Sequence, residues 1–294
     1  MKRLPIPLIL LFLCAAGARG QSPGGAWDSV DKVFGQPGKD MPGDVHRFGW
    51  PRSDLRVTIG GIPVEPALAL GSWSAFKKTG AGDEAVTMGD LVLLGSEVDP
   101  VIGALQAGGF EIFAVHNHLI GESPRVLYLH FHGHGDAVAL AKTLKNALAK
   151  TKTPTFGKAP AKPAEAQQKT FDKLQEVLGH KGTMAGAVLQ VGVPRAETIQ
   201  DGGMEIPGSM GMANAMNFQM VGPRVATTGD FVLIADEVNP VIKELRAHGL
   251  VITALHSHML RENPRLFFMH FWGVGTPEKI GEGLKAALSR VATK

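Results

Sequence analysis

Cysteine is nearly missing from this chain of 294 residues, which has a single one, Cys14. It lies in an N-terminal stretch typical of a secretory signal, with Lys2 and Arg3 before a short apolar run and small residues after it. The run is shorter than the roughly 20 residues of a membrane-spanning helix. We therefore predict a cleaved signal over residues 1–20 and an exported, periplasmic or secreted protein. A lipid anchor on Cys14 is the alternative.

Several other signals are missing, and each absence argues against a class of protein. A mature chain without cysteine has no disulfide, so a transition metal must be held by His, Asp, Glu or Met. There is no P-loop, no dinucleotide fingerprint and no Gly-x-Ser-x-Gly elbow. The net charge of +3 belongs partly to the leader, and no basic cluster indicates binding to nucleic acid. No later stretch is apolar enough to span a membrane.

Histidine, in contrast, is concentrated in one repeated stretch. Residues 110–135, FEIFAVHNHLIGESPRVLYLHFHGHG, hold five of the eleven histidines, and residues 250–275, LVITALHSHMLRENPRLFFMHFWGVG, hold three more. The copies align without a gap at a separation of 140 residues, and the likeness extends upstream. The chain is therefore predicted to consist of two homologous domains, residues 27–148 and 170–292. The Ala-, Lys- and Pro-rich residues 149–169 are expected to form an extended linker.

Hydrophobic periodicity predicts the same elements in each copy. Alternating and β-branched segments indicate strands, and apolar positions three and four apart indicate helices. Asp136 is expected to cap a helix that follows the histidine strands. This order favours an α+β fold, with a mostly antiparallel sheet in each domain and helices packed on one of its faces. In the first copy, strands are expected near 44–50, 55–60, 72–77, 84–88, 91–94, 110–118 and 125–132, and helices at 27–34, 97–107 and 136–150.

The spacing of three histidines in each copy predicts a metal site. Side chains two apart on a strand share a face, so His116 and His118 point the same way. A hairpin centred near residues 122–123 would place His130 opposite His116. Three neutral imidazoles suit Zn, Cu, Fe or Ni and leave a position open for water or substrate. We expect one such site in each repeat, held in the second copy by His256, His258 and His270. Histidines on a polar sheet face, without metal, are the alternative.

Further candidate residues for chemistry lie in the same stretch of the first copy, and the glutamate and the arginine recur in the second copy as Glu262 and Arg265. His132, replaced by Trp272 in the second copy, is a fourth ligand or a general base. Glu122, in the hairpin turn, is a ligand, a proton shuttle or a solvated turn residue. Arg125 either binds an anionic substrate or pairs with the neighbouring glutamate.

The motifs MGDLVLLGSEVDPV, AVHNHLIGESPRV and LHFHGHGD, and their second copies, resemble the LppY/LpqO family of exported bacterial proteins and lipoproteins. The resemblance covers essentially the whole mature chain and implies export and duplication, but no established activity. Cys14 departs from the lipid-attachment pattern of the family's lipoproteins. A looser similarity, carried by His-x-His and a third histidine about a dozen residues later, is to acetolactate decarboxylase and zinc proteins of its fold group.

These observations predict an exported protein that binds a transition metal, zinc or copper, through the histidines of each repeat. The first hypothesis is a zinc-dependent hydrolase or lyase acting on a small molecule, in which metal activates water or polarises a carbonyl while His132 or Glu122 moves protons. The second is a non-catalytic protein that handles copper or zinc. The third is a structural exported domain stabilised by its metals.

Overall fold

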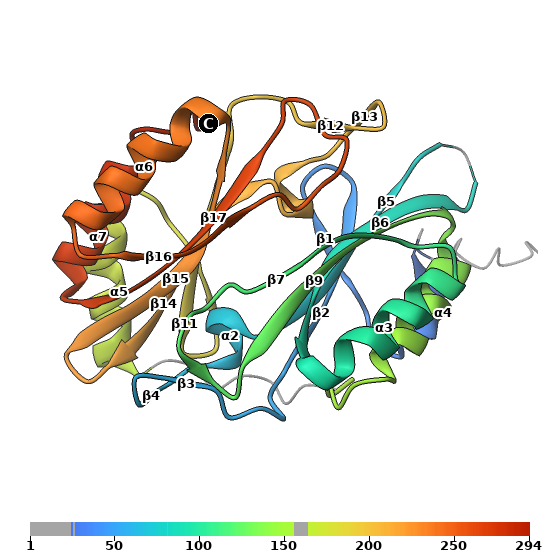
Figure 1. Cartoon of the computed structure of the whole chain (residues 1–294), viewed down its shortest axis with the longest axis horizontal. Helices are drawn as coiled ribbons and strands as arrows, with labels where there is room; N and C mark the ends of the chain where they lie inside the picture. Colours follow the sequence, from blue (N-terminus) through green and yellow to red (C-terminus); the bar gives the residue numbers. More distant parts are fainter. Residues whose placement is uncertain (1–24, 26, 81, 156–163) are drawn as a thin grey trace, which may run out of the picture.

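The computed structural model describes residues 25, 27–80, 82–155 and 164–294, so the predicted signal and Cys14 lie outside the described residues. It confirms the expected α+β fold: two similar halves lie side by side, each built on a six-stranded antiparallel sheet with helices on its outer face (Figure 1). None of the helices in these residues is long and apolar enough to cross a membrane.

The strand order is the same in both sheets. The first runs β1 (Lys39–Met41), β2 (Val45–Pro51), β5 (Gly71–Lys78), β6 (Glu84–Leu94), β9 (Val126–Asp136) and β7 (Glu111–His116). The second runs β10 (Thr183–Ala185), β11 (Val188–Pro194), β14 (Ala213–Val221), β15 (Arg224–Leu233), β17 (Phe267–Gly275) and β16 (Val251–His256). Short strands add two small sheets: β4 (Ile62–Pro63), β3 (Thr58–Ile59) and β8 (Glu122–Ser123), and the pair β12 (Gln200–Asp201) and β13 (Met204–Glu205).

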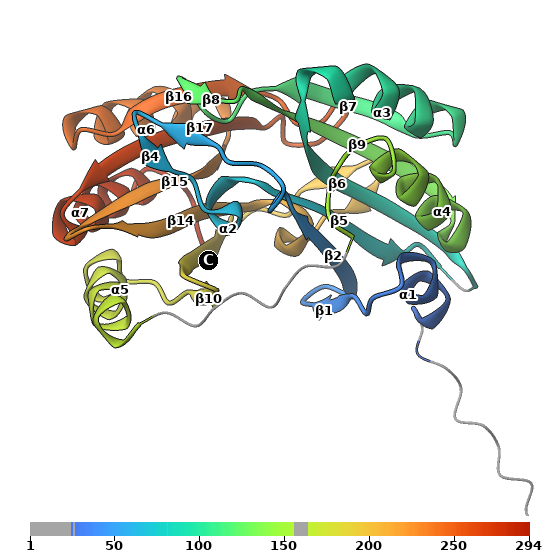
Figure 2. The ribbon, with the colours of Figure 1, turned by 90° about the horizontal axis from the view of Figure 1, so that it is seen from below.

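Most of the helices cover the outer faces of the two sheets (Figure 2). Phe48, Leu91 and Leu129 are among the residues that bury the outer face of the first sheet against these helices. Asp136 caps a helix as predicted, because its Oδ1 accepts a hydrogen bond from the Ala139 N–H at 2.8 Å. The helices are α1 (Asp28–Phe34), α2 (Pro66–Ala69), α3 (Gly95–Ala107) and α4 (Ala137–Leu148), then α5 (Glu165–Leu178), the 3₁₀ turn η1 (Gly208–Met210), α6 (Ala235–Ala247) and α7 (Pro277–Leu288).

Part of the predicted linker is helical, which corrects the expectation of an extended segment. Helix α5 begins at Glu165 rather than at residue 170. Its first turn is stabilised locally: the Gln167 side chain accepts from the Ala164 N–H at 3.0 Å, and Glu165 pairs with Lys169 one turn later at 3.0 Å. Residues 156–163 lie outside the described residues, and the exact domain limits stay a prediction.

A buried ion pair fixes each sheet to the helix that follows its fourth strand. In the first half, Arg52 donates to Glu97 at 2.7 Å, and Glu97 also accepts from the Leu94 N–H at the start of α3. Arg195 and Glu237 repeat this arrangement at 2.6 Å. Both glutamates are therefore occupied by helix capping and pairing, the structural role that their position at a helix N-terminus indicates.

The inner faces of the two sheets face each other, and a short segment of each half packs on the inner face of the other half's sheet. Helix α2 of the first half packs on the second sheet, where Gln190 donates to the Ala67 carbonyl at 2.8 Å and Asn217 to that of Leu68 at 2.8 Å. Turn η1 of the second half packs on the first sheet, where Arg47 donates to the Ser209 carbonyl at 3.2 Å. This reciprocal exchange gives the pair of repeats an approximate two-fold arrangement around their shared interior.

Candidate metal centre

Strands β7 and β9 position the histidines of the first half. His130 projects from the inner face of β9, His116 ends β7, and His118 follows that strand. The predicted register is wrong by two residues: His116 lies opposite Tyr128, and Ala114 lies opposite His130. The hairpin loop, which is longer than a tight turn, accounts for this shift, and a bulge between Ile112 and Ala114 moves the register by one more residue farther from the loop. The imidazoles of His116 and His130 still lie together, with ring centroids 5.0 Å apart.

The two histidine triads, which were expected to lie apart in separate repeats, form one cluster between the halves. The ring centroids of His116 and His256 are 3.6 Å apart. His118 lies 3.7 Å from His270, and His130 lies 3.7 Å from His258. These last two contacts are related by the repeat, because 118 and 130 correspond to 258 and 270. The cluster therefore surrounds the approximate two-fold axis.

The Nε2 atoms of the clustered histidines, which could bind a metal ion, have no hydrogen-bond partner within the described part of the chain. The Nε2 atom of each of the six histidines is buried and makes no hydrogen bond. Buried polar atoms are normally satisfied, and each exception requires an explanation such as an ion. Three overlapping groups bring their ligand atoms within 4.8 Å of one another: His116, His118, His130 and His258; His116, His256 and His270; and Asp230, His258 and His270.

Two aspartates that the histidine spacing does not reveal complete the cluster: Asp90 is buried and Asp230 is partly buried. Asp90 is paired with His130 across β6 and β9, and Asp230 with His270 across β15 and β17. An Asp90 carboxylate oxygen lies 3.7 Å from His118 Nε2, and the Oδ1 atoms of both aspartates lack hydrogen-bond partners. The Gly-Asp motif at 89–90, repeated at 229–230, is the sequence signal that marks both positions.

Burial controls the protonation of the cluster. It lowers the pKa of every histidine in the cluster. The pKa falls to about 4 for His256 and, with a smaller contribution from the neighbouring His256 imidazole, to about 3 for His116. Burial also raises the pKa values of Asp90 and Asp230 well above their ordinary range. The six imidazoles are thus neutral at pH 7, which is the form that binds a metal ion.

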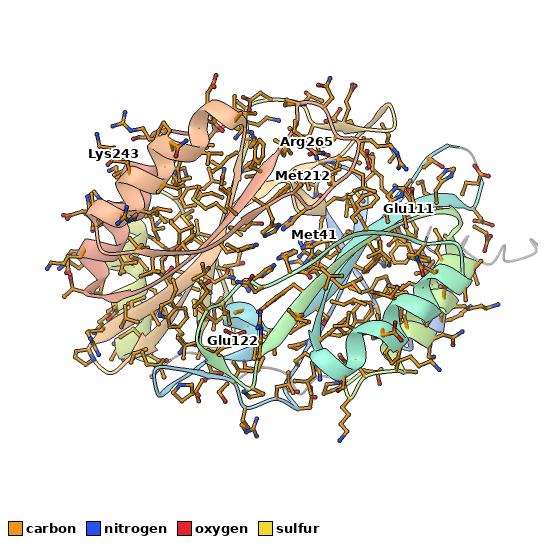
Figure 3. All side chains as sticks on the ribbon, viewed as in Figure 1. Met41, Glu111, Glu122, Met212, Lys243 and Arg265 are labelled. Atoms are coloured by element: carbon orange, nitrogen blue, oxygen red, sulfur yellow. The ribbon has the colours of Figure 1, made fainter. Side chains whose placement is uncertain are left out.

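The structure places the three other candidate residues outside these groups of donor atoms. His132 lies on the inner face, stacked on Phe113 at 5.3 Å, and burial lowers its pKa. Glu122 belongs to β8, and Arg125 is exposed beside it. In the second half, Arg265 pairs with Glu262 at 3.1 Å, which is the ion pair considered for Arg125. Figure 3 shows Glu122 below and Arg265 above the centre of the molecule, on opposite sides of the approximate two-fold axis.

A cavity of about 740 Å³ lies between the sheets and reaches the histidine cluster. Its walls include Asp90, Asp230 and four of the cluster's histidines, His118, His130, His258 and His270. Apolar side chains form much of the rest, among them Met41 and Met212, which lie in the middle of the molecule in Figure 3. This volume is typical of sites for small molecules.

The family of the chain is defined by comparison with known proteins. A profile described as Domain of Unknown Function (DUF1259) matches residues 28–150 and again 172–290, so the chain belongs to this family and carries two copies of its domain. No curated protein matches the chain. Among solved structures, a trimeric bacterial microcompartment shell protein, PduB, aligns over 86% of this chain and 89% of its own length. The identity is 12% and the TM-score 0.20.

Proposed function

We propose that this chain is an exported metal-dependent enzyme, a hydrolase or lyase, with one transition-metal centre shared by its two repeats. The observation that carries the proposal is the set of six buried Nε2 atoms without partners, which converge from both halves. Neutral imidazole donors suit zinc, which three or four of them can hold, with copper as the second candidate. The export signal and the resemblance to the LppY/LpqO family support a location outside the cytoplasm.

The cavity favours an enzyme over a protein that only stores metal. A storage site needs no chamber for an organic molecule, whereas this cluster forms one end of a cavity of about 740 Å³. A metal held there would supply Lewis acidity to a water or a carbonyl. Asp90 lies beside His118 and His130 and is positioned to hold a proton in the cavity. The roles of His132, Glu122 and Arg125 in proton transfer or anion binding stay predictions.

Elemental analysis of the purified mature protein tests the metal proposal. We expect at least about one zinc or copper ion per chain after metal-replete purification, and less than half an ion would overturn it. Given bound metal, a screen of esters and oxo-acids should find a turnover that chelation abolishes and that His130→Ala lowers by 100-fold or more, as expected for loss of several kcal/mol of transition-state stabilisation. A full metal complement without any turnover would favour the non-catalytic metal-handling protein instead.

A further inference from the structure

The two walls of the cavity differ in chemistry although the fold repeats. The strand pairing of the first sheet aligns Trp73 with Asp90 and His130 across its inner face, and the second sheet has Ala215 at the position of Trp73. The next row of residues paired across the inner face differs even more between the two sheets. It reads Arg47, Ala75, Met88 and His132 in the first sheet but Gln190, Asn217, Thr228 and Trp272 in the second.

Arg47 is the cation of the first wall. Its guanidinium lies 4.1 Å from the centre of the Trp73 ring, and its one hydrogen bond within the described part of the chain goes to the Ser209 carbonyl. Burial lowers its pKa to about 10, with Asp90 opposing the shift, so Arg47 remains charged at neutral pH. The Trp73 face and the Ser209 carbonyl hold the guanidinium in place, while its other N–H groups are left to bind a ligand in the cavity that Arg47 lines.

The second wall offers no matching charge. Gln190 and Asn217 also line the cavity, but their amides donate to the carbonyls of Ala67 and Leu68. Their hydrogen bonds thus attach helix α2 to the second sheet. Among the described lining residues, the other basic side chain is Lys294, which is exposed at the C-terminus. Of these two basic side chains, Arg47 is the one that is partly buried in the cavity wall.

Arg47 and the histidine cluster lie on the same face of the first sheet but are separated across its strands. A ligand that contacts both must span this distance. Strands β5 and β6 lie between β2, which carries Arg47, and β9, which carries His130. Three strand spacings of about 4.8 Å place the two backbones roughly 14 Å apart, and both side chains reach into the same cavity. Met88, Phe113 and Met212 provide apolar wall in this chamber. A bound molecule that reaches both ends needs an apolar body several atoms long.

We propose that the cavity binds a small organic acid whose carboxylate pairs with Arg47 while an oxygen at its other end reaches the metal centre. The guanidinium fork matches a carboxylate with two parallel hydrogen bonds, and such charge-assisted pairs are strong when partly desolvated. The inference rests on the proposed metal centre for the second contact only, because the Arg47 contact needs no metal.

Titration calorimetry of the zinc-loaded protein with linear dicarboxylates, from succinate to sebacate, tests this inference. We expect the affinity to be highest at an intermediate length such as suberate. Octanoate, which lacks the second carboxylate, should bind about 10- to 100-fold more weakly, as should suberate to Arg47→Met, because each change removes one charged hydrogen-bonded pair. Arg47→Lys should keep part of the affinity. The exposed Arg56→Met is the matched control and should bind suberate as the wild type does.

The outcomes separate this inference from the proposed function, because zinc content is measured on the same samples. Suberate binding that depends on Arg47 in a protein without metal would support the acid site and overturn the metal centre. Full zinc content with equal binding of octanoate and suberate, or with no effect of Arg47→Met, would overturn the acid site alone. So would the absence of binding tighter than about 1 mM across the series.

Discussion

Removal of zinc with a chelator should lower the melting temperature of this protein by about 10 °C. A ligand at a thousand times its dissociation constant stabilises the folded state by about 4 kcal/mol, and each kcal/mol is worth roughly 2–4 °C in a chain of this size. The physical reason lies in the six buried Nε2 atoms, which have no hydrogen-bond partner when metal is absent. Differential scanning calorimetry, with and without zinc, measures the shift.

A variant that lacks two of the donors is the control for this shift. The double substitution His118→Ala and His130→Ala removes imidazoles from the largest group of donor atoms. We expect its melting temperature to be independent of added zinc. A wild-type melting temperature that is unchanged by chelation, or an equal zinc-dependent shift in the variant, would show that the cluster does not hold the ion.

The metal-free protein should also lose stability steeply as the pH falls below about 6.5. Burial lowers the pKa of all six clustered histidines, to about 3 for His116 and about 4 for His256, whereas an unfolded histidine titrates near 6.5. Between these values the unfolded chain binds more protons than the folded chain, so the free energy of unfolding falls with falling pH. Each histidine contributes about 1.4 kcal/mol per pH unit.

Six histidines would together give a slope on the order of 5 kcal/mol per pH unit, after a reduction for two opposing groups. Asp90 and Asp230 oppose it because their raised pKa values let the folded chain bind protons that the unfolded chain releases. Urea unfolding of metal-free protein at pH 7.5 and 5.5 measures the effect. The His118→Ala, His130→Ala variant should show a smaller slope. An unfolding free energy that stays constant over this interval would contradict the predicted burial of neutral imidazoles.

The sequence predicts much of each half because its signals are local. The period-two pattern of β9 and the Asp136 cap depend on neighbouring residues, and both are found in the structure. Strand β6 shows where local signals mislead. Gly89-Asp90 suggests a break between two strands, yet Glu84–Leu94 is continuous. A Cβ on Gly89 would lie 2.2 Å from the Trp73 carbonyl oxygen, so the glycine allows close strand packing rather than a turn.

The shared centre depends on contacts that no local pattern encodes. The 140-residue repeat identifies both histidine triads, but their convergence results from the docking of one half on the other. In that interface, Asn117 donates to the Thr253 carbonyl at 3.0 Å, and Glu111 pairs with Arg261 at 2.7 Å. Asp90 and Asp230 line the same cavity from opposite sheets. Sequence spacing alone therefore suggests two separate sites, whereas the fold brings both triads together.

Metal content in variants of a single repeat tests the shared centre most directly. His118→Ala with His130→Ala changes only the first repeat, and His258→Ala with His270→Ala changes only the second. His132→Ala, which lies outside the groups of donor atoms, is the matched control. If one centre is shared, elemental analysis should find that either pair of substitutions removes nearly all the metal, while His132→Ala keeps the wild-type amount. If each pair of substitutions leaves half of the wild-type metal, the two repeats bind metal independently and the shared centre is wrong.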